Sequence, residues 1–156
     1  MKIKNIVTED FVNYCKPSMF IVCNKCSFKC DKEAGRSICQ NSALVREPDK
    51  DINCSTIFNL YVNNPISKAL VLGGLEPFDS DELLHLITLF REESDDDIVI
   101  YTGYTEEEIQ KQIKQLKGFK NIIIKFGRFV PNQEKHYDEV LGVELASPNQ
   151  YARRIS

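Results

Sequence analysis

KALVLGG, residues 68–74, is a continuous apolar run that ends in two glycines. A short run of this kind, without alternation of apolar and polar residues, is typical of a strand buried on both faces. Three further runs share this character: MFIV at 19–22, DIVIYTG at 97–103 and NIIIKFG at 121–127. Because strands buried on both faces are a feature of parallel sheets covered by helices, these runs predict a parallel sheet.

Helical patterns lie between these strands. The segments 55–64, 80–93 and 105–118 carry apolar residues at helical spacing. Parallel strands need crossover connections, and these helices supply them. With EVLGVEL at 139–145 as a fifth strand, we expect an α/β fold. The expected architecture is an open partial (β/α) barrel of about five mostly parallel strands with crossover helices, fewer than the eight of a closed barrel. It forms a single domain over residues 1–156.

The composition excludes several classes of protein. Of the 156 residues 42% are hydrophobic and 28% are charged, and the net charge of −3 comes without a strongly basic block, so we expect no nucleic-acid partner. No apolar run approaches the ~20 residues of a membrane helix, and the N-terminus lacks the apolar segment of a secretory signal. We therefore expect a cytoplasmic protein, in which clustered cysteines are more often metal ligands or catalytic groups than disulfides.

A cluster of thiols follows the predicted strand at 19–22, and it consists of Cys23, Cys26, Cys30 and Cys39. Thiolates without a nearby histidine suit either zinc or an iron–sulfur centre. Zinc requires a closed set of four ligands, and the Cys23-x-x-Cys26 spacing is typical of such sites. An iron–sulfur cluster held by three of the thiols leaves one iron open for a substrate or cofactor.

The remaining cysteines and the two histidines have simpler interpretations. Cys15 and Cys54 are expected to be small buried hydrophobic residues. His85 lies inside a predicted helix and His136 far downstream, so both are expected to be surface or packing residues.

The ends of the predicted strands point to one shared site. They carry the cysteine loop, Gly73-Gly74, Thr102-Gly103 and Gly127-Arg128. In open parallel sheets ligands bind at the carboxyl ends of the strands. We therefore expect these segments to meet around one ligand.

Four stretches, in order along the chain, resemble the radical S-adenosylmethionine enzymes that activate anaerobic (class III) ribonucleotide reductase. They are MFIV running into Cys26-x3-Cys30 and Cys39-Gln40-Asn41, then GGLEPF at 73–78, IYTGYT at 100–105, and KFGRF at 125–129 with ASPNQ at 146–150. The similarity covers residues 18 to 155. The sequence departs from the family pattern where eight residues separate Cys30 from Cys39 instead of two, and where a leucine interrupts Gly-Gly-Glu-Pro.

The resemblance implies a role for each matching residue. Cys26, Cys30 and Cys39 would be the catalytic ligands of a 4Fe–4S cluster, with Cys23 packed beside it. The residues expected at S-adenosylmethionine are Gly73, Gly74 and Glu76 at its methionine end, Thr102 at the ribose or carboxylate, Arg128 at the carboxylate or a partner surface, and Asn149 in adenine or backbone recognition. A helix cap is the alternative role for Asn149.

The resemblance also implies an activity. The enzyme would reductively cleave S-adenosylmethionine to a 5′-deoxyadenosyl radical and install a glycyl radical on a partner, the large subunit of anaerobic ribonucleotide reductase. Its electron donor would be a protein such as a flavodoxin. Three alternatives remain open: a radical enzyme acting on another peptide or a small molecule, a non-catalytic zinc-binding α/β module, and a relative that binds the cluster but has lost cleavage of S-adenosylmethionine.

Overall fold

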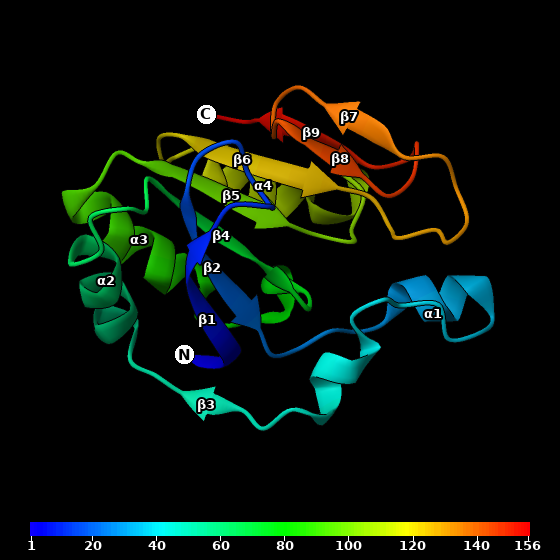
Figure 1. Cartoon of the computed structure of the whole chain (residues 1–156), viewed down its shortest axis with the longest axis horizontal. Coiled ribbons are helices and arrows are strands. Elements are labelled where there is room, and N and C mark those ends of the chain that lie inside the picture. Colours follow the sequence, from blue (N-terminus) through cyan, green and yellow to red (C-terminus); the bar gives the residue numbers. More distant parts are fainter.

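The computed structural model describes all 156 residues as an α/β protein built on one seven-stranded sheet (Figure 1). The strand order is β3-β1-β2-β4-β5-β6-β9, and β7 and β8 form a separate pair. The strands are β1 (Lys2–Asp10), β2 (Ser18–Cys23), β3 (Lys50–Asp51), β4 (Ala69–Gly74), β5 (Asp97–Tyr101), β6 (Ile122–Phe126), β7 (His136–Asp138), β8 (Val143–Leu145) and β9 (Tyr151–Arg154).

The helices connect these strands. They are α1 (Lys29–Ala34), α2 (Cys54–Val62), α3 (Leu83–Glu93) and α4 (Gln110–Leu116), with short 3-10 helices at Ser42–Arg46, Pro77–Asp79 and Glu107–Ile109. The three predicted helical segments are therefore confirmed, with bounds shifted by a few residues. Asn53 caps α2, because its side chain accepts a hydrogen bond from the Ser55 N–H.

The central part of the sheet is parallel, as the apolar runs predict. β2, β4, β5 and β6 pair side by side in parallel, while β1 and β9 are antiparallel to their neighbours. The sheet stays open, and it does not form a clear partial barrel of five strands. The fifth strand expected at 139–145 is only partly correct, since β8 covers its last three residues and pairs with β7 outside the main sheet. The preceding residues form a turn around Asp138, whose carboxylate accepts hydrogen bonds from the Leu141 and Ala152 N–H groups.

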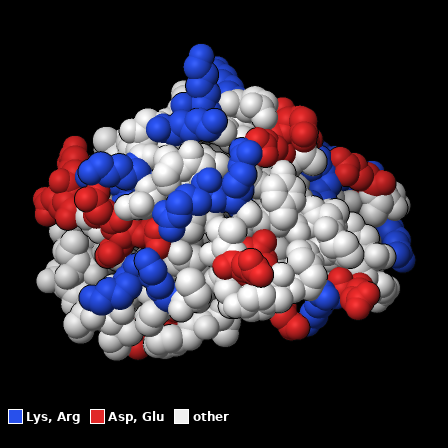
Figure 2. Space-filling view, turned by 90° about the horizontal axis from the view of Figure 1, so that it is seen from above, with Lys and Arg blue, Asp and Glu red and all other residues white.

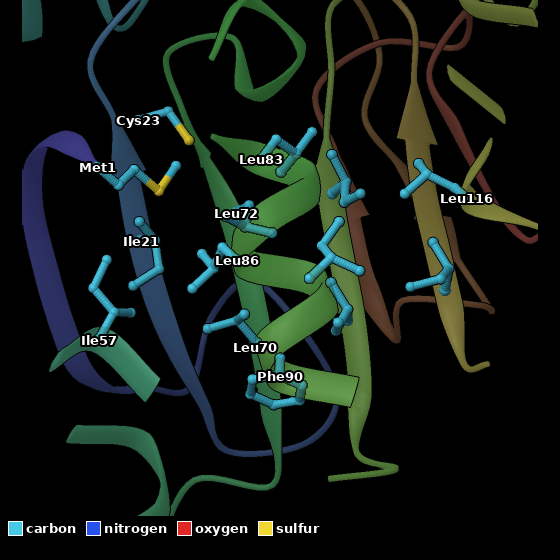
Figure 3. Packing of buried hydrophobic residues seen from close by; sticks show 14 of the residues in the cluster. Met1, Ile21, Cys23, Ile57, Leu70, Leu72, Leu83, Leu86, Phe90 and Leu116 are labelled. Carbon is cyan, nitrogen blue, oxygen red and sulfur yellow. The ribbon is translucent and has the colours of Figure 1, made fainter. Parts of the chain in front are cut away.

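One face of the sheet is covered by α2, α3 and α4. Side chains alternate along a strand, so every second residue of the parallel strands points to this face. Figure 3 shows Leu86 and Phe90 of α3 lying against Leu70 and Leu72 of β4, and the side chain of Cys23 at the end of the same cluster. All of these side chains are at most 1% exposed. At ~25 cal/mol per Å² of buried apolar surface, this layer is the main source of stability.

The opposite face of the sheet is covered only in part. Near the amino ends of the strands, Val71, Val99 and Ile123 pack against Tyr14 and Leu141. Toward the carboxyl ends no helix covers this face. The cysteine loop lies beside this part of the face. Figure 1 shows that the loop extends from β2 and that α1 stands apart from the sheet. We call this uncovered part of the sheet the inner face.

The surface carries charges of both signs. Figure 2 shows Lys and Arg mixed with Asp and Glu on one side of the molecule, together with wide uncharged areas. None of the helices has the length and hydrophobicity required to cross a lipid bilayer.

Candidate iron–sulfur and ligand site

A cavity of about 410 Å³ lies between the inner face and the cysteine loop. Its size falls within the ~300–1,000 Å³ range of small-molecule sites. The wall from the loop includes all three predicted ligands, Cys26, Cys30 and Cys39. The wall from the sheet comes from the carboxyl ends of the strands, and it includes Gly74, Glu76, Thr102, Gly103, Lys125 and Gly127. These strand ends, which we expect to share one site, thus line one cavity.

The cysteine loop is shaped by a few local interactions. The Cys26 sulfur accepts a hydrogen bond from the Phe28 N–H at 3.3 Å, and Phe28 has a left-handed conformation with φ of 52°. Cys30 lies in the first turn of α1. The Asp31 carboxylate accepts hydrogen bonds from the N–H groups of Ile38 and Cys39, both at 2.8 Å. Asp31 therefore closes the long segment between Cys30 and Cys39 and fixes the position of the last cysteine.

The role of Asp31 gives a testable prediction. We expect Asp31→Ala to release the segment before Cys39, so that the protein loaded with iron and sulfide loses iron to a chelator about ten-fold faster. Lys32→Ala is the control, since it changes an exposed residue of the same helix. Equal rates of iron loss in the two variants would show that Asp31 does not organise the loop.

Three hydrogen bonds of 2.7 Å attach the loop to the end of β4 and to the turn that follows it. The Asn41 side chain donates to the Gly74 carbonyl at 2.7 Å, and the Glu76 N–H donates to the Lys25 carbonyl at 2.7 Å. The Ser27 N–H donates to Asp79, also at 2.7 Å. The loop is thus tied at both ends to the turn that follows β4.

Glu76 is the carboxylate of the cavity wall, and it is 6% exposed. It accepts hydrogen bonds from the Thr102 hydroxyl at 2.7 Å and from the N–H groups of Gly103 at 2.9 Å and Phe78 at 3.2 Å. Burial raises the pKa of Glu76 to about 7, although these three donors act in the opposite direction. The Thr102 hydroxyl is used to orient Glu76.

The two glycines at the end of β4 are required by packing. A Cβ on Gly73 would lie 3.1 Å from the side chains of both Phe20 and Tyr101. Gly74 has φ of +78°, and a Cβ there would lie 2.6 Å from Val22. Of the two glycines, Gly74 lines the cavity and Gly73 does not.

Arg128 lies outside this cavity, in a network that holds α1. Its guanidinium donates to both oxygens of Glu108 and to the Gly103 carbonyl, all at 2.7 Å, and its Nε forms an ion pair with Glu33 of α1 at 2.8 Å. These contacts use the donors that the sequence analysis assigned to a ligand carboxylate. Asn149 is also absent from the cavity wall. It is exposed, its side chain donates a hydrogen bond to the Arg128 carbonyl, and no helix begins or ends at this position for it to cap.

The cavity wall also includes residues to which the sequence assigned no role, among them Lys125 and Gln150. Lys125 is 7% exposed and points from β6 to the inner face, where its ammonium donates to the Gly127 carbonyl at 3.1 Å. Gln150 is 5% exposed and donates to the same carbonyl. A signal for Lys125 existed in the sequence, since a lysine interrupts the apolar run NIIIKFG at an inner-face position.

The thiols of the cavity suit a cluster of several irons. Burial raises the pKa of Cys26 to about 11 and also raises that of Cys39, so both are protonated at neutral pH until a metal displaces the proton. No three Cys, His, Asp or Glu side chains lie close enough together to bind one metal ion. In a 4Fe–4S cluster each thiolate binds a different iron, so thiols spread along one cavity wall are a suitable donor set.

The other cysteines and the histidines lie elsewhere. Cys23 is fully buried among hydrophobic residues of the helix-covered face, and burial raises its pKa to about 12. Cys54 is buried as predicted, whereas the prediction for Cys15 is wrong, because it is exposed on the loop between β1 and β2. His85 is exposed on α3, and His136 is partly buried in β7.

Comparison with known families agrees with the donor set. The sequence model of the family described as a 4Fe-4S single cluster domain matches residues 15–149. The chain belongs to this family, and it is an iron–sulfur protein whose cofactor is a 4Fe–4S cluster. No curated protein and no solved structure shows a significant match to the chain.

Proposed function

We propose that this protein is a radical S-adenosylmethionine activating enzyme, in which Cys26, Cys30 and Cys39 bind the 4Fe–4S cluster and leave one iron open. The observation that carries the proposal is the shared cavity wall, in which these cysteines face the Gly74-Leu75-Glu76 turn and the ends of β5 and β6. When bound, the reduced cluster supplies one electron to the sulfonium, which cleaves S-adenosylmethionine to methionine and a 5′-deoxyadenosyl radical.

The charges of the cavity wall support a ligand with an α-amino acid group. Apart from the thiols, the charged residues of this wall are one acid and one base, Glu76 and Lys125. Such a pair matches the ammonium and the carboxylate at the methionine end of S-adenosylmethionine. Glu76 already accepts three hydrogen bonds, and a carboxylate has about four acceptor sites, so it has room for one further donor. Lys125 has three donors and uses one on Gly127.

The remaining wall residues orient rather than react. Thr102 and the Gly103 N–H hold Glu76 in place, and Asn41 fixes the cysteine loop against Gly74. The apolar side chains of Phe20 and Val22 exclude water from the inner face. Exclusion of water is useful to radical chemistry, because it prevents side reactions of the reactive species.

The substrate in this proposal is a glycine of a glycyl-radical enzyme, the large subunit of anaerobic ribonucleotide reductase, with a flavodoxin-type donor for the electron. Hydrogen transfer from that glycine to the 5′-deoxyadenosyl radical yields 5′-deoxyadenosine and leaves the radical on the partner. The support is the sequence resemblance, together with the open carboxyl edge of the sheet, which a loop of a large partner could reach.

The experiment that tests the proposal measures 5′-deoxyadenosine. The anaerobic, cluster-loaded protein is mixed with S-adenosylmethionine and dithionite, and we expect equal amounts of 5′-deoxyadenosine and methionine. With the reductase subunit added, electron spin resonance should detect a glycyl radical. Product without a glycyl signal would indicate another substrate, and a colourless protein holding one tight zinc would reject the proposal.

The pKa of Glu76 gives a further prediction. Its carboxyl group becomes charged as the pH rises through about 7, and only the charged form attracts an ammonium. We expect the affinity of the cluster-loaded protein for S-adenosylmethionine to rise through this window and then level off. Glu76→Gln should lower the affinity about ten-fold at pH 8 and remove the rise. Glu139→Gln, at an exposed position outside the cavity wall, is the control for equilibrium binding. An unchanged pH profile in the Glu76 variant would contradict this role.

A further inference from the structure

Lys125 is a buried cation that the packing of the sheet does not explain. It lies on β6 in register with Tyr101 of β5, where the other central positions of these strands are apolar. Burying a lysine costs free energy unless its charge is compensated. The ammonium has one hydrogen bond, to the Gly127 carbonyl at 3.1 Å, and the Tyr101 ring centroid lies 6.0 Å away. Neither contact carries a negative charge, so the ammonium has no ion-pair partner within the protein.

Lys125 lines the same cavity as Glu76 and the three cysteines. Its backbone carbonyl accepts a hydrogen bond from the Thr102 N–H at 2.9 Å. The next residue, Gly103, lies against Cys30, whose sulfur is 3.7 Å from the position of a Cβ on that glycine. Burial lowers the pKa of Lys125 to about 8, while charges on Cys30 and Glu76 act in the opposite direction. The end of β5 that pairs with Lys125 therefore continues into the residue that contacts Cys30.

Other cations near the cysteines are already neutralised or face solvent. Arg128 is paired with Glu108 and Glu33, and Lys29 is paired with Glu108 at 2.8 Å. Lys32 is exposed on α1. Lys125 is thus the one basic residue in the cavity wall, where it is 7% exposed and forms no ion pair.

We propose that Lys125 tunes the cluster electrostatically, with its buried ammonium raising the reduction potential of the 4Fe–4S centre held by Cys26, Cys30 and Cys39. The net charge around an iron–sulfur cluster is one of the determinants of its potential. Reduction adds one negative charge to the cluster, and a nearby fixed positive charge stabilises the reduced form. This inference rests on the ligand assignment of the proposed function but not on S-adenosylmethionine or on any radical step.

The test is a redox titration of the cluster-loaded protein without S-adenosylmethionine, followed by electron spin resonance. Lys125→Met removes the charge, and we expect its midpoint potential to become more negative. Lys125→Arg keeps the charge and should remain near the original protein. Lys32→Met removes an exposed charge in the loop and should also leave the potential nearly unchanged, because water screens it.

A purely structural role for Lys125 would give a different pattern. It would lower the thermal stability or the iron content of the Met variant and leave the potential of the remaining clusters unchanged, which would overturn the proposal. Lys125→Gln is a second neutral variant that retains a donor for the Gly127 carbonyl, and it should shift the potential in the same direction as Lys125→Met. An error in the assignment of Cys26, Cys30 and Cys39 as ligands would be detected by a different result, since alanine variants of these cysteines would then keep their iron.

Discussion

Cys30→Ala is expected to abolish binding of the 4Fe–4S cluster. The Cys30 thiol lies in the cavity between α1 and the end of β5, against Gly103. Changes to the outer contacts of a metal ligand already cost roughly 10–100-fold in affinity, so loss of a ligand should reduce iron content by more than about ten-fold. The measurement is iron and sulfide per chain, with visible absorbance, after anaerobic reconstitution. Cys26→Ala and Cys39→Ala should behave in the same way.

Two other cysteines provide matched controls. Cys15→Ala changes an exposed thiol on the loop between β1 and β2, outside the cavity wall, and should leave iron content unchanged. Cys23→Ala removes a sulfur from the hydrophobic cluster, so we expect lower stability with the cluster retained. If Cys23→Ala lost the cluster while Cys39→Ala kept it, the ligand set would include Cys23 in place of Cys39.

The parallel part of the fold was predictable because its strands are buried on both faces. A run such as the three isoleucines at 122–124 has few other places in a soluble protein, and here Ile122, Ile123 and Ile124 are all fully buried, on alternate faces of the sheet. The outer strands gave no such signal. β9 is short and only Ala152 of its four residues is buried, so its sequence resembles that of a loop. β1 is more exposed than the central strands and carries charged residues along its length.

The site was predictable where metal binding or backbone conformation restricts the type of residue. It was less predictable where the role of a side chain depends on which residues the fold places beside it. The thiols and Gly74 follow from the sequence, since ligands and a positive φ restrict the residue type. Arg128 follows strand β6 as a ligand-binding arginine would, but its partners Glu33 and Glu108 come from distant segments. Only the folded chain brings those acids together, and they occupy the guanidinium.

The segment between Cys30 and Cys39 shows the same limit. Its length suggested a tolerated insertion, because loop closure depends only weakly on length. In the structure the segment is α1, a turn at Gly35 and the Asp31 carboxylate that joins its two ends. The added residues therefore form an ordered element, held to the sheet through Glu33 and Arg128.

Gly127→Ala is expected to destabilise the protein by roughly 2–4 kcal/mol. Gly127 has φ of +99°, and a Cβ there would lie 2.5 Å from the carbonyl oxygen of Asn149. That oxygen belongs to the backbone entering β9, so the clash is not relieved by rotating a side chain. The Gly127 carbonyl also accepts hydrogen bonds from Lys125 and Gln150, and a shift of this segment would disturb the cavity wall.

Gly35→Ala separates the free-energy cost of the left-handed conformation from the cost of the clash. Gly35 also has a positive φ, of +65°, but a Cβ there would meet no atom within 4 Å. Its substitution should cost only about 1 kcal/mol, the penalty of the left-handed conformation. Denaturant unfolding of the cluster-free protein gives both free energies, with unchanged m values as evidence of a preserved fold. Both variants place alanine in a left-handed conformation, so the difference between their losses of stability measures the clash with the Asn149 carbonyl. Equal losses of stability would mean that β9 moves aside without cost.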